Sequence, residues 1–317
     1  NYDIITTHFS LEAFIMRFVR WLYKKPYVLI MVGDTDLELI EGKRADNASQ
    51  LTHYAARECV VHGYYPEVLT KGVDQERFNL NVDGSEMRSC YIKNKDQFLV
   101  ITVCRLEPRK NLETLIESAR LLEKEHKNIY KFVIVGGGVD EGILKDLVKK
   151  YKLGDVVYFT GMLPSTSDEL TKHYAAADVF AMPTLHEGFG YVFTEAMAFG
   201  LPVIGTDTSS VPEVIEDVGI VVPIRSPKKL AEAIIKVHNN PKLREKMIKK
   251  GFVRIEFLYW ENMIGKYEKF LCTAIKRFKR RNSLVRRTLF FIWSFIADLP
   301  LLVYVLLVSQ VLPIKRE

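Results

Sequence analysis

The sequence contains few cysteines, and they form no metal-binding or disulfide pattern. Its four cysteines, Cys59, Cys90, Cys104 and Cys272, are widely and irregularly spaced. There is no C-x-x-C pair, and the histidines do not cluster at the spacing of zinc ligands. The pattern therefore indicates no metal site and favours a reduced, cytoplasmic compartment.

The sequence also lacks a secretory signal, a repeat at a solenoid period and low-complexity segments. It begins at Asn1 and runs almost at once into the apolar stretch 2–5, which is typical of a strand. We therefore expect the true N-terminus to precede Asn1. With 317 residues, 48% of them hydrophobic, the chain is long enough for two α/β domains that each bury a core.

Acidic residues are missing from one short stretch near the C-terminal end. The formal net charge is +6, but seven basic residues fall in this stretch: Lys276, Arg277, Lys279, Arg280, Arg281, Arg286 and Arg287. Without them and the last three residues, the remaining chain carries a charge of about −2. Because the basic charge belongs to a tail, it points to anionic lipid, and we expect no nucleic-acid partner.

Residues 288–314 are nearly unbroken apolar sequence, with Asp298 as their only charge and Pro300 two residues later. At about 20 residues per bilayer crossing, the segment is long enough to span once, and its apolar residues outweigh the cost of Asp298. Because Asp298 and Pro300 divide it into halves, a re-entrant or in-plane hairpin is an alternative, and a helix packed on the protein itself is another. The positive-inside tendency places the basic stretch 275–287 in the cytoplasm, which predicts membrane association at the cytoplasmic face of the cell membrane.

Short apolar runs alternate with helical patterns along the rest of the chain. The first part predicts strands at 3–6, 27–32, 59–61 and 67–69 and a helix at 11–23, and leaves 34–50 unassigned. From Phe98 we expect strands at 98–103, 131–135, 156–159, 179–182, 202–204 and 219–222. Helices are expected at 112–126, 141–151, 166–176, 191–199, 211–215, 228–239 and 263–278. This alternation predicts a parallel, doubly wound α/β sheet that binds ligand at the carboxyl ends of its strands.

Two cations flank the turn between the predicted strand 98–103 and the helix that begins at Leu112. Arg105 and Lys110 can both reach the carboxyl edge of the sheet from this turn. Cations near a helix N-terminus are slightly unfavourable unless an anion is bound, so the pair favours an anionic ligand. Two solvated basic residues at a helix start are the alternative.

The sequence His186-Glu187-Gly188-Phe189-Gly190 lies between a predicted strand and a helix, and Glu195 follows on that helix. The glycines let the backbone approach a ligand, and a helix N-terminus presents N–H groups suited to diphosphate or sugar oxygens. Glu195, one turn into the helix, can accept hydrogen bonds from vicinal ribose hydroxyls. Taken alone, these features could also be a tight turn and an exposed helix acid.

Together these motifs resemble the family 4 retaining glycosyltransferases of the GT-B fold, also called glycosyl transferases group 1. The resemblance covers about residues 99–267. It rests on Glu187 and Glu195 with seven residues between them, the continuation Glu-Ala-Met-Ala-x-Gly-x-Pro-Val through Val203, and Arg105 with four residues before Lys110. Glu141 stands where a dinucleotide fingerprint that starts at the 136–138 glycines needs its third glycine, so an NAD site is not expected.

The resemblance implies a role for each matching residue. It assigns the donor phosphates to Arg105 and Lys110 beside Gly188, Phe189 and Gly190, the donor sugar to Glu187, and the ribose to Glu195. The nucleotide base is assigned to backbone at Gly161, Met162 and Leu163. His8 resembles a histidine that related enzymes place near the reacting sugar, and a histidine that merely ends a strand is the alternative. Ser209-Ser210 stand where the family often has paired glycines, which bears on donor preference.

The resemblance also implies a domain organisation. Residues 1–84 correspond to a partial N-terminal, acceptor-side Rossmann-like domain, with the interdomain crossing near Gly72-Val73-Asp74. Residues 85–274 correspond to the nucleotide-sugar donor-binding domain with its closing helix. The basic juxtamembrane stretch 275–287 and the hydrophobic membrane segment 288–314 follow.

The implied activity is retaining transfer of a hexose from a nucleoside-diphosphate sugar to a lipid-linked or polysaccharide acceptor, with no cofactor or metal required. One alternative is a catalytically incomplete scaffold subunit that binds nucleotide sugar within a membrane glycosylation complex. Another is a sugar phosphorylase or epimerase on the same fold.

Overall fold

A computed structural model describes residues 4–7, 19–31, 42–43, 45–70 and 72–281 of the chain. The chain divides into two compact units. The first comprises Asn1–Gln50, Glu58–Glu67 and Tyr267–Glu317, and the second comprises Leu51–Arg57 and Val68–Lys266. His8 and the predicted membrane segment 288–314 lie outside the described residues, and the functional division at residue 84 stays a prediction.

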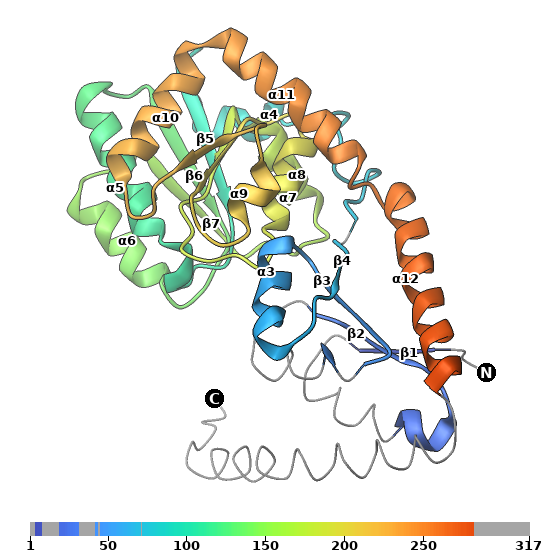
Figure 1. Cartoon of the computed structure of the whole chain (residues 1–317). Helices are drawn as coiled ribbons and strands as arrows, with labels where there is room; N and C mark the ends of the chain where they lie inside the picture. Colours follow the sequence, from blue (N-terminus) through green and yellow to red (C-terminus); the bar gives the residue numbers. More distant parts are fainter. Residues whose placement is uncertain (1–3, 8–18, 32–41, 44, 71, 282–317) are drawn as a thin grey trace, which may run out of the picture. The chain divides into compact units, whose positions relative to one another are not determined.

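The second unit is built on a six-stranded parallel sheet (Figure 1). Its strands lie in the order β10-β9-β8-β5-β6-β7. They are β5 (Phe98–Val103), β6 (Tyr130–Val135), β7 (Val157–Gly161), β8 (Val179–Ala181), β9 (Val203–Thr206) and β10 (Ile220–Val222). All six predicted strands are confirmed within two residues. The inner strands β5, β6, β8 and β9 are almost fully buried, as expected for apolar runs in a parallel sheet covered on both faces.

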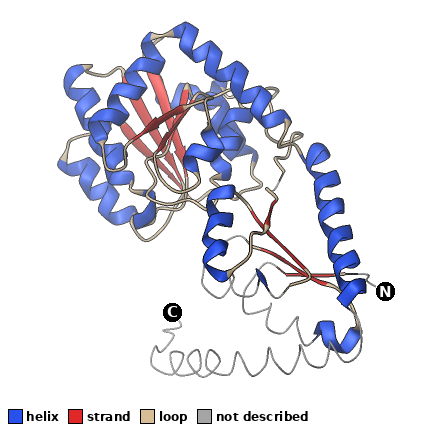
Figure 2. Ribbon diagram, in the orientation of Figure 1, coloured by secondary structure: helices blue, strands red, loops and turns tan. Residues whose placement is uncertain are grey.

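Helices cover both faces of this sheet (Figure 2). On one face, α5 (Leu112–Glu125), α6 (Glu141–Lys150) and α10 (Pro227–Asn239) pack on strand residues such as Val100 and Phe132. On the other face, Phe180 of β8 contacts Tyr174 of α7 (Asp168–Ala176) and Phe193 of α8 (Tyr191–Ala198). The predicted doubly wound architecture is therefore confirmed.

Four further helices complete the second unit or extend beyond it. The sequence predicted α9 (Val211–Ile215) and, over most of its length, α12 (Trp260–Arg281). It did not predict α4 (Ser85–Tyr91) or the basic helix α11 (Pro241–Glu256). In α11 only Met247, Gly251 and Ile255 are buried, so its apolar pattern is too sparse to stand out in the sequence.

The first unit contains a four-stranded sheet in the order β1-β2-β3-β4. Its strands are β1 (Ile5–Thr7), β2 (Tyr27–Ile30), β3 (Asn47–Gln50) and β4 (Glu67–Val68), with β4 at the boundary between the units. A buried ion pair joins Arg20 Nε to Asp46 Oδ2 at 2.7 Å, and the Arg20 guanidinium lies 4.9 Å from the ring centroid of Phe278 on α12.

One predicted strand is wrong. After α3 (His53–Glu58), residues Cys59–His62 form the 3₁₀ helix η1 in place of the strand expected at 59–61. Gly63 closes η1 in the left-handed region at φ 76°, where its N–H bonds the carbonyls of Cys59 and Val60. Cys59 is buried and Val61 is 87% exposed, so the apolar run does not reflect a buried strand.

The basic stretch predicted at 275–287 begins as part of α12, which is described as far as Arg281. There Arg277 Nη1 donates to Asn47 Oδ1 at 2.5 Å within the first unit. Among the residues that the structure describes, no helix is both long enough and apolar enough to cross a membrane.

Candidate functional site

The candidate site lies where the strand order of the six-stranded sheet reverses. The chain goes from β5 to β6 and β7 on one side, then returns to place β8 against the other side of β5. In open parallel sheets, ligands bind outside the carboxyl ends of the strands at such a switch point. Arg105 and Lys110 follow β5 and Glu187 follows β8, so the predicted residues flank this switch point.

Direct contacts join the loops that follow β5 and β8. The Lys110 ammonium forms an ion pair with Glu187 Oε1, and both side chains are about nine-tenths buried. Beside them, Leu185 N donates to Arg109 O at 2.7 Å, and Asn111 Nδ2 donates to Pro183 O at 3.1 Å. The structure therefore places a phosphate-binding candidate and the sugar-binding candidate in contact.

Arg105 lies at the open rim of the same loop. Its side chain is 66% exposed, and its Nη2 lies 3.6 Å from Glu107 Oε1, which also accepts from Arg109 Nε at 2.5 Å. Partial burial raises the pKa of Glu107, but the Arg109 hydrogen bond and the charges of Arg109, Arg105 and Lys110 hold it below its usual value. Arg105 and Arg109 thus share one carboxylate, and this leaves a positive rim suited to a diphosphate.

The glycines after β6 lie so close to the backbone of the loop after β5 that two of them leave no room for a side chain. A Cβ on Gly136, whose φ is +139°, would lie 1.9 Å from the Cys104 carbonyl oxygen. One on Gly138 would lie 2.3 Å from Leu106 O, and Gly136 N donates to Gly161 O at 3.0 Å. Burial raises the pKa of the Cys104 thiol beneath this loop to about 12.

The predicted base-binding residues follow β7 beside this glycine loop. A Cβ on Gly137 would lie 3.3 Å from Met162 Cβ, and the Met162 side chain is 63% exposed. Gly161 ends β7 with φ +79°, and Leu163 is half-buried. These residues therefore line the part of the edge next to the loop of Gly136.

Ser209 and Ser210 hold the Glu187–Gly190 turn. The sequence analysis noted these serines only because the family often has paired glycines at their positions. Glu187 N donates to Ser209 Oγ at 2.8 Å, while the fully buried Ser210 donates through Oγ to Glu187 O at 2.8 Å and to Phe189 O at 3.4 Å. Gly190 adopts φ 86° as the N-cap of α8, so the turn, including Gly188, leads directly into the helix N-terminus. The sequence gives no local signal for these contacts because the partners are more than 20 residues apart.

Ser210→Ala is expected to lower the free energy of unfolding by about 1–3 kcal/mol, because it leaves the Glu187 carbonyl buried without its hydroxyl donor. Urea denaturation gives the measurement. Ser118→Ala is the matched control, since Ser118 is equally buried and donates to Leu115 O at 2.7 Å inside α5. Equal losses in the two variants would show that Ser210 does not hold the turn.

Glu195 lies one turn into α8 and is half-buried. Its Oε2 accepts a hydrogen bond from the fully buried Tyr174 hydroxyl at 2.8 Å. Burial raises the pKa of Glu195, while the Tyr174 hydrogen bond and the charge of Arg77 lower it. A buried phenol of α7 therefore holds the Glu195 carboxylate on α8.

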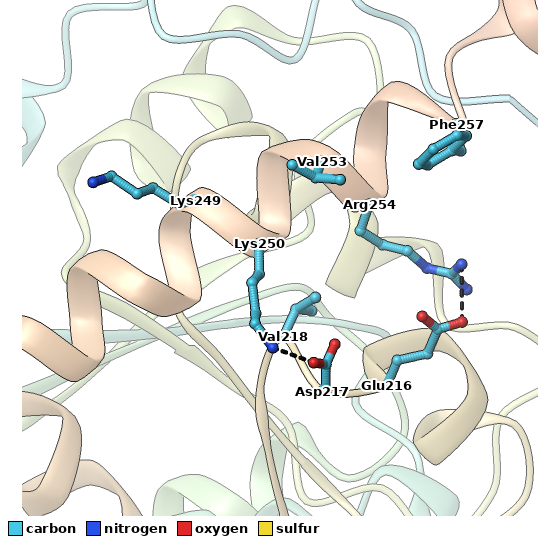
Figure 3. Close-up of a pocket in the computed structure, with 8 residues that line it drawn as sticks. All are labelled: Glu216, Asp217, Val218, Lys249, Lys250, Val253, Arg254 and Phe257. Atoms are coloured by element: carbon cyan, nitrogen blue, oxygen red, sulfur yellow. Dashed lines mark hydrogen bonds and ion pairs between the residues drawn. The ribbon is translucent and has the colours of Figure 1, made fainter.

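A pocket of about 320 Å³ lies elsewhere in the second unit (Figure 3). It is lined by Glu216, Asp217, Val218, Lys249, Lys250, Val253, Arg254 and Phe257. Because Glu216, Asp217 and Val218 come just before β10, the pocket lies at the opposite, amino edge of the sheet. Its charged side chains are paired, and Arg254 Nη1 lies 2.9 Å from Glu216 Oε1. It contains none of the predicted residues, so we locate the candidate site at the carboxyl edge.

Within the described part of the chain, no group of three or more His, Cys, Asp or Glu side chains is arranged to hold a metal ion. His8 is not among the described residues, and its role stays a prediction.

The sequence profile of the family described as "Glycosyl transferases group 1" matches residues 85–254. The GDP-mannose-dependent alpha-(1-6)-phosphatidylinositol monomannoside mannosyltransferase of Mycobacterium tuberculosis is 32% identical over 219 residues, covering 65% of this chain and 55% of that protein. O-antigen chain mannosyltransferase B of Escherichia coli is 30% identical over 158 residues, covering 50% of this chain and 41% of that protein. The chain thus spans about half the length of these curated relatives.

Solved structures show the same fold. Anabaena Alr3699/HepE in complex with UDP aligns with a TM-score of 0.77 at 17% identity, covering 86% of this chain and 79% of that one. Sucrose-phosphate synthase from Thermosynechococcus elongatus aligns with a TM-score of 0.72 at 23% identity, covering 86% and 74%. The fold is therefore GT-B-like, with parallel α/β sheets.

Proposed function

The chain belongs to the glycosyl transferases group 1, and on that premise we propose that it is a retaining glycosyltransferase. It would move a hexose from a nucleoside-diphosphate sugar to a lipid-linked or polysaccharide acceptor. The observation that carries the proposal is the contact between Lys110 and Glu187 across the switch point of the sheet. This contact supports the proposal because it joins the cation proposed to bind phosphate and the acid proposed to bind sugar at the kind of edge where parallel sheets hold nucleotides.

The proposed chemistry needs fixed positive charge where the bond to the phosphate breaks. The bond between the anomeric carbon and the β-phosphate oxygen is cleaved, and the acceptor hydroxyl forms its new bond on the same face of the sugar. The acceptor proton passes to the departing phosphate oxygen. Lys110, Arg105 and the N–H groups at the start of α8 would stabilise the charge on that oxygen, and Glu187 would orient the sugar.

The relatives support the donor and acceptor classes. The names of those from M. tuberculosis and E. coli specify mannosyl transfer, the former from GDP-mannose, and the Anabaena neighbour was solved with UDP. We therefore propose a hexose donor and take GDP-mannose as the first to test, with UDP-sugars second. Product formation on a membrane fraction, with the anomeric configuration read by NMR, tests both transfer and retention.

We propose that the protein works at the cytoplasmic face of the cell membrane, attached through residues 288–314. The support is the apolar composition of that segment and the basic stretch before it. Fractionation of cells that express the chain with and without residues 288–314 provides the test. Equal recovery of both forms in the soluble fraction would refute attachment by this segment.

Glu195→Ala is expected to weaken binding of the nucleoside diphosphate roughly 10- to 100-fold, because hydrogen bonds from ribose hydroxyls to a carboxylate are lost. Isothermal titration calorimetry with GDP and UDP gives the measurement. Glu232→Ala is the control, since Glu232 lies on α10 in an exposed pair with Lys229. Unchanged affinity in Glu195→Ala would remove the ribose assignment, and binding without any turnover would favour a scaffold.

A further inference from the structure

Two residues that the sequence analysis did not single out converge on Glu195. The Arg77 guanidinium carbon lies 4.8 Å from the ring centroid of Phe78. The Phe78 ring meets Tyr174 edge-on at 6.4 Å, and the Tyr174 hydroxyl donates to Glu195 Oε2 at 2.8 Å. A continuous set of contacts therefore leads from the segment after Val73 to the acid on α8.

Tyr174 is fixed so firmly that its hydroxyl can orient the carboxylate. The residue is fully buried, and its ring stacks on Phe199 at 5.4 Å and on Phe180 at 6.3 Å. A carboxylate offers about four lone-pair sites, so one hydrogen bond from Tyr174 leaves enough acceptors for the two hydroxyls of a ribose. The phenol thus defines the orientation of Glu195 without consuming its binding capacity.

Arg77 supplies charge rather than a direct contact. Its Nη2 is buried and has no hydrogen-bond partner among the described residues, so no acceptor takes up the charge at that nitrogen. Burial raises the pKa of Glu195, and the Tyr174 hydrogen bond and the Arg77 charge oppose that rise. The Tyr174 hydrogen bond and the Arg77 charge therefore favour the ionised form of the carboxylate.

We propose that Arg77 and Tyr174 are positioning residues that hold Glu195 as an oriented, ionised carboxylate for the ribose of the donor. The inference rests on the proposed function, because it requires Glu195 to bind ribose. A protonated Glu195 would lose acceptor capacity, and an unoriented one would meet only one of two vicinal hydroxyls. Neither residue needs to touch the nucleotide for this role.

The test compares nucleotides that differ only at the ribose. We would titrate UDP, GDP and their 2′,3′-dideoxy counterparts into the wild type and into Arg77→Gln, Arg77→Lys and Tyr174→Phe. Arg77→Gln and Tyr174→Phe are expected to bind the ribose nucleotide about tenfold more weakly and the dideoxy nucleotide as the wild type does. Arg77→Lys is expected to restore most of the affinity because it keeps the charge.

Measuring nucleotide affinity over a range of pH tests the charge role directly, because a purely structural role of Arg77 would not shift the pH dependence of binding. Removing the Arg77 charge raises the pKa of Glu195, and ribose binding needs the ionised form. Binding by Arg77→Gln should therefore be lost at a higher pH than binding by the wild type as the pH falls. The controls are Arg120→Gln, whose guanidinium stacks on Tyr151 at 5.0 Å, and Tyr158→Phe, whose hydroxyl donates to Asp155 O at 3.0 Å.

Each other outcome overturns the inference in a recognisable way. Equal losses for ribose and dideoxy nucleotides would mean that Arg77 or Tyr174 serves the phosphates, the base or the fold. Unchanged affinity, or an unshifted pH profile in Arg77→Gln, would remove the charge role. If the wild type bound neither nucleotide, the proposed function itself would fail, and this inference with it. If the wild type binds the nucleotides and the Arg77 and Tyr174 variants bind them equally well, only the positioning role is overturned and the proposed function stands.

Discussion

Lys110→Met is expected to lower kcat/KM by about 10²- to 10³-fold and the free energy of unfolding by about 3–5 kcal/mol. The loss of activity follows from removing the cation that we propose faces the departing phosphate. The loss of stability follows because Glu187, whose side chain is only 10% exposed, would be left as a buried charge without its partner. Steady-state kinetics with GDP-mannose and urea denaturation measure the two effects separately.

A double-mutant cycle with Glu187→Gln separates stability from chemistry. In the double variant both side chains are neutral, so no unpaired charge is buried. Its loss in free energy of unfolding is therefore expected to be smaller than the sum of the losses in the two single variants. Its activity should stay as low as that of Lys110→Met, because no cation returns. A double variant that recovered activity would contradict a role for Lys110 in the chemistry.

The matched control is the Lys250–Asp217 pair of the pocket at the amino edge of the sheet (Figure 3). It joins the same two chemical groups, but the Asp217 side chain is 74% exposed. Lys250→Met is therefore expected to change the free energy of unfolding by less than about 1 kcal/mol and to leave kcat/KM unchanged. If the stability losses of the Lys110 and Glu187 variants simply added, as expected for an exposed pair, the two side chains would have no coupling energy.

The donor-side sheet could be predicted from sequence because its signals are local. Each strand from Phe98 to Val222 is a short apolar run, and each is followed by a helical pattern or a turn. Arg105, Lys110 and Glu187 could be found for the same reason, since each follows a strand whose carboxyl end was already placed. The contact between Lys110 and Glu187 follows from topology, because parallel strands bring their carboxyl ends to one edge.

The missed elements depend on contacts between distant residues. The strand β3 contains the polar residues Asn47, Ser49 and Gln50, which are buried all the same. Asn47 Nδ2 donates hydrogen bonds to Glu67 Oε1 and to Phe270 O, and no local sequence pattern predicts such distant partners. Tyr174 was likewise absent from the predicted site because its partner Glu195 is 21 residues away on another helix.

Gly136→Ala is expected to lower the free energy of unfolding by more than about 4 kcal/mol, although it adds a single methyl group. The added Cβ would lie 1.9 Å from the Cys104 carbonyl oxygen, and the residue would keep a φ of +139° that side chains rarely adopt. Relief requires the loops after β5 and β6 to separate, which breaks the hydrogen bonds from Cys104 N to Val135 O and from Leu106 N to Gly137 O. Circular dichroism in urea measures the loss, and nucleotide titration of any folded fraction measures the damage to the site.

Gly142→Ala is the control for Gly136→Ala because it makes the same chemical change six residues later. A Cβ on Gly142 meets nothing within 4 Å, and the residue lies in α6, where alanine is favoured over glycine. It should stabilise the protein by about 0.5–1 kcal/mol. If Gly136→Ala behaved like Gly142→Ala, backbone contact would not explain the glycine at position 136. Close approach of a ligand would then be the reason for it, and the variant should fold normally yet bind nucleotide poorly.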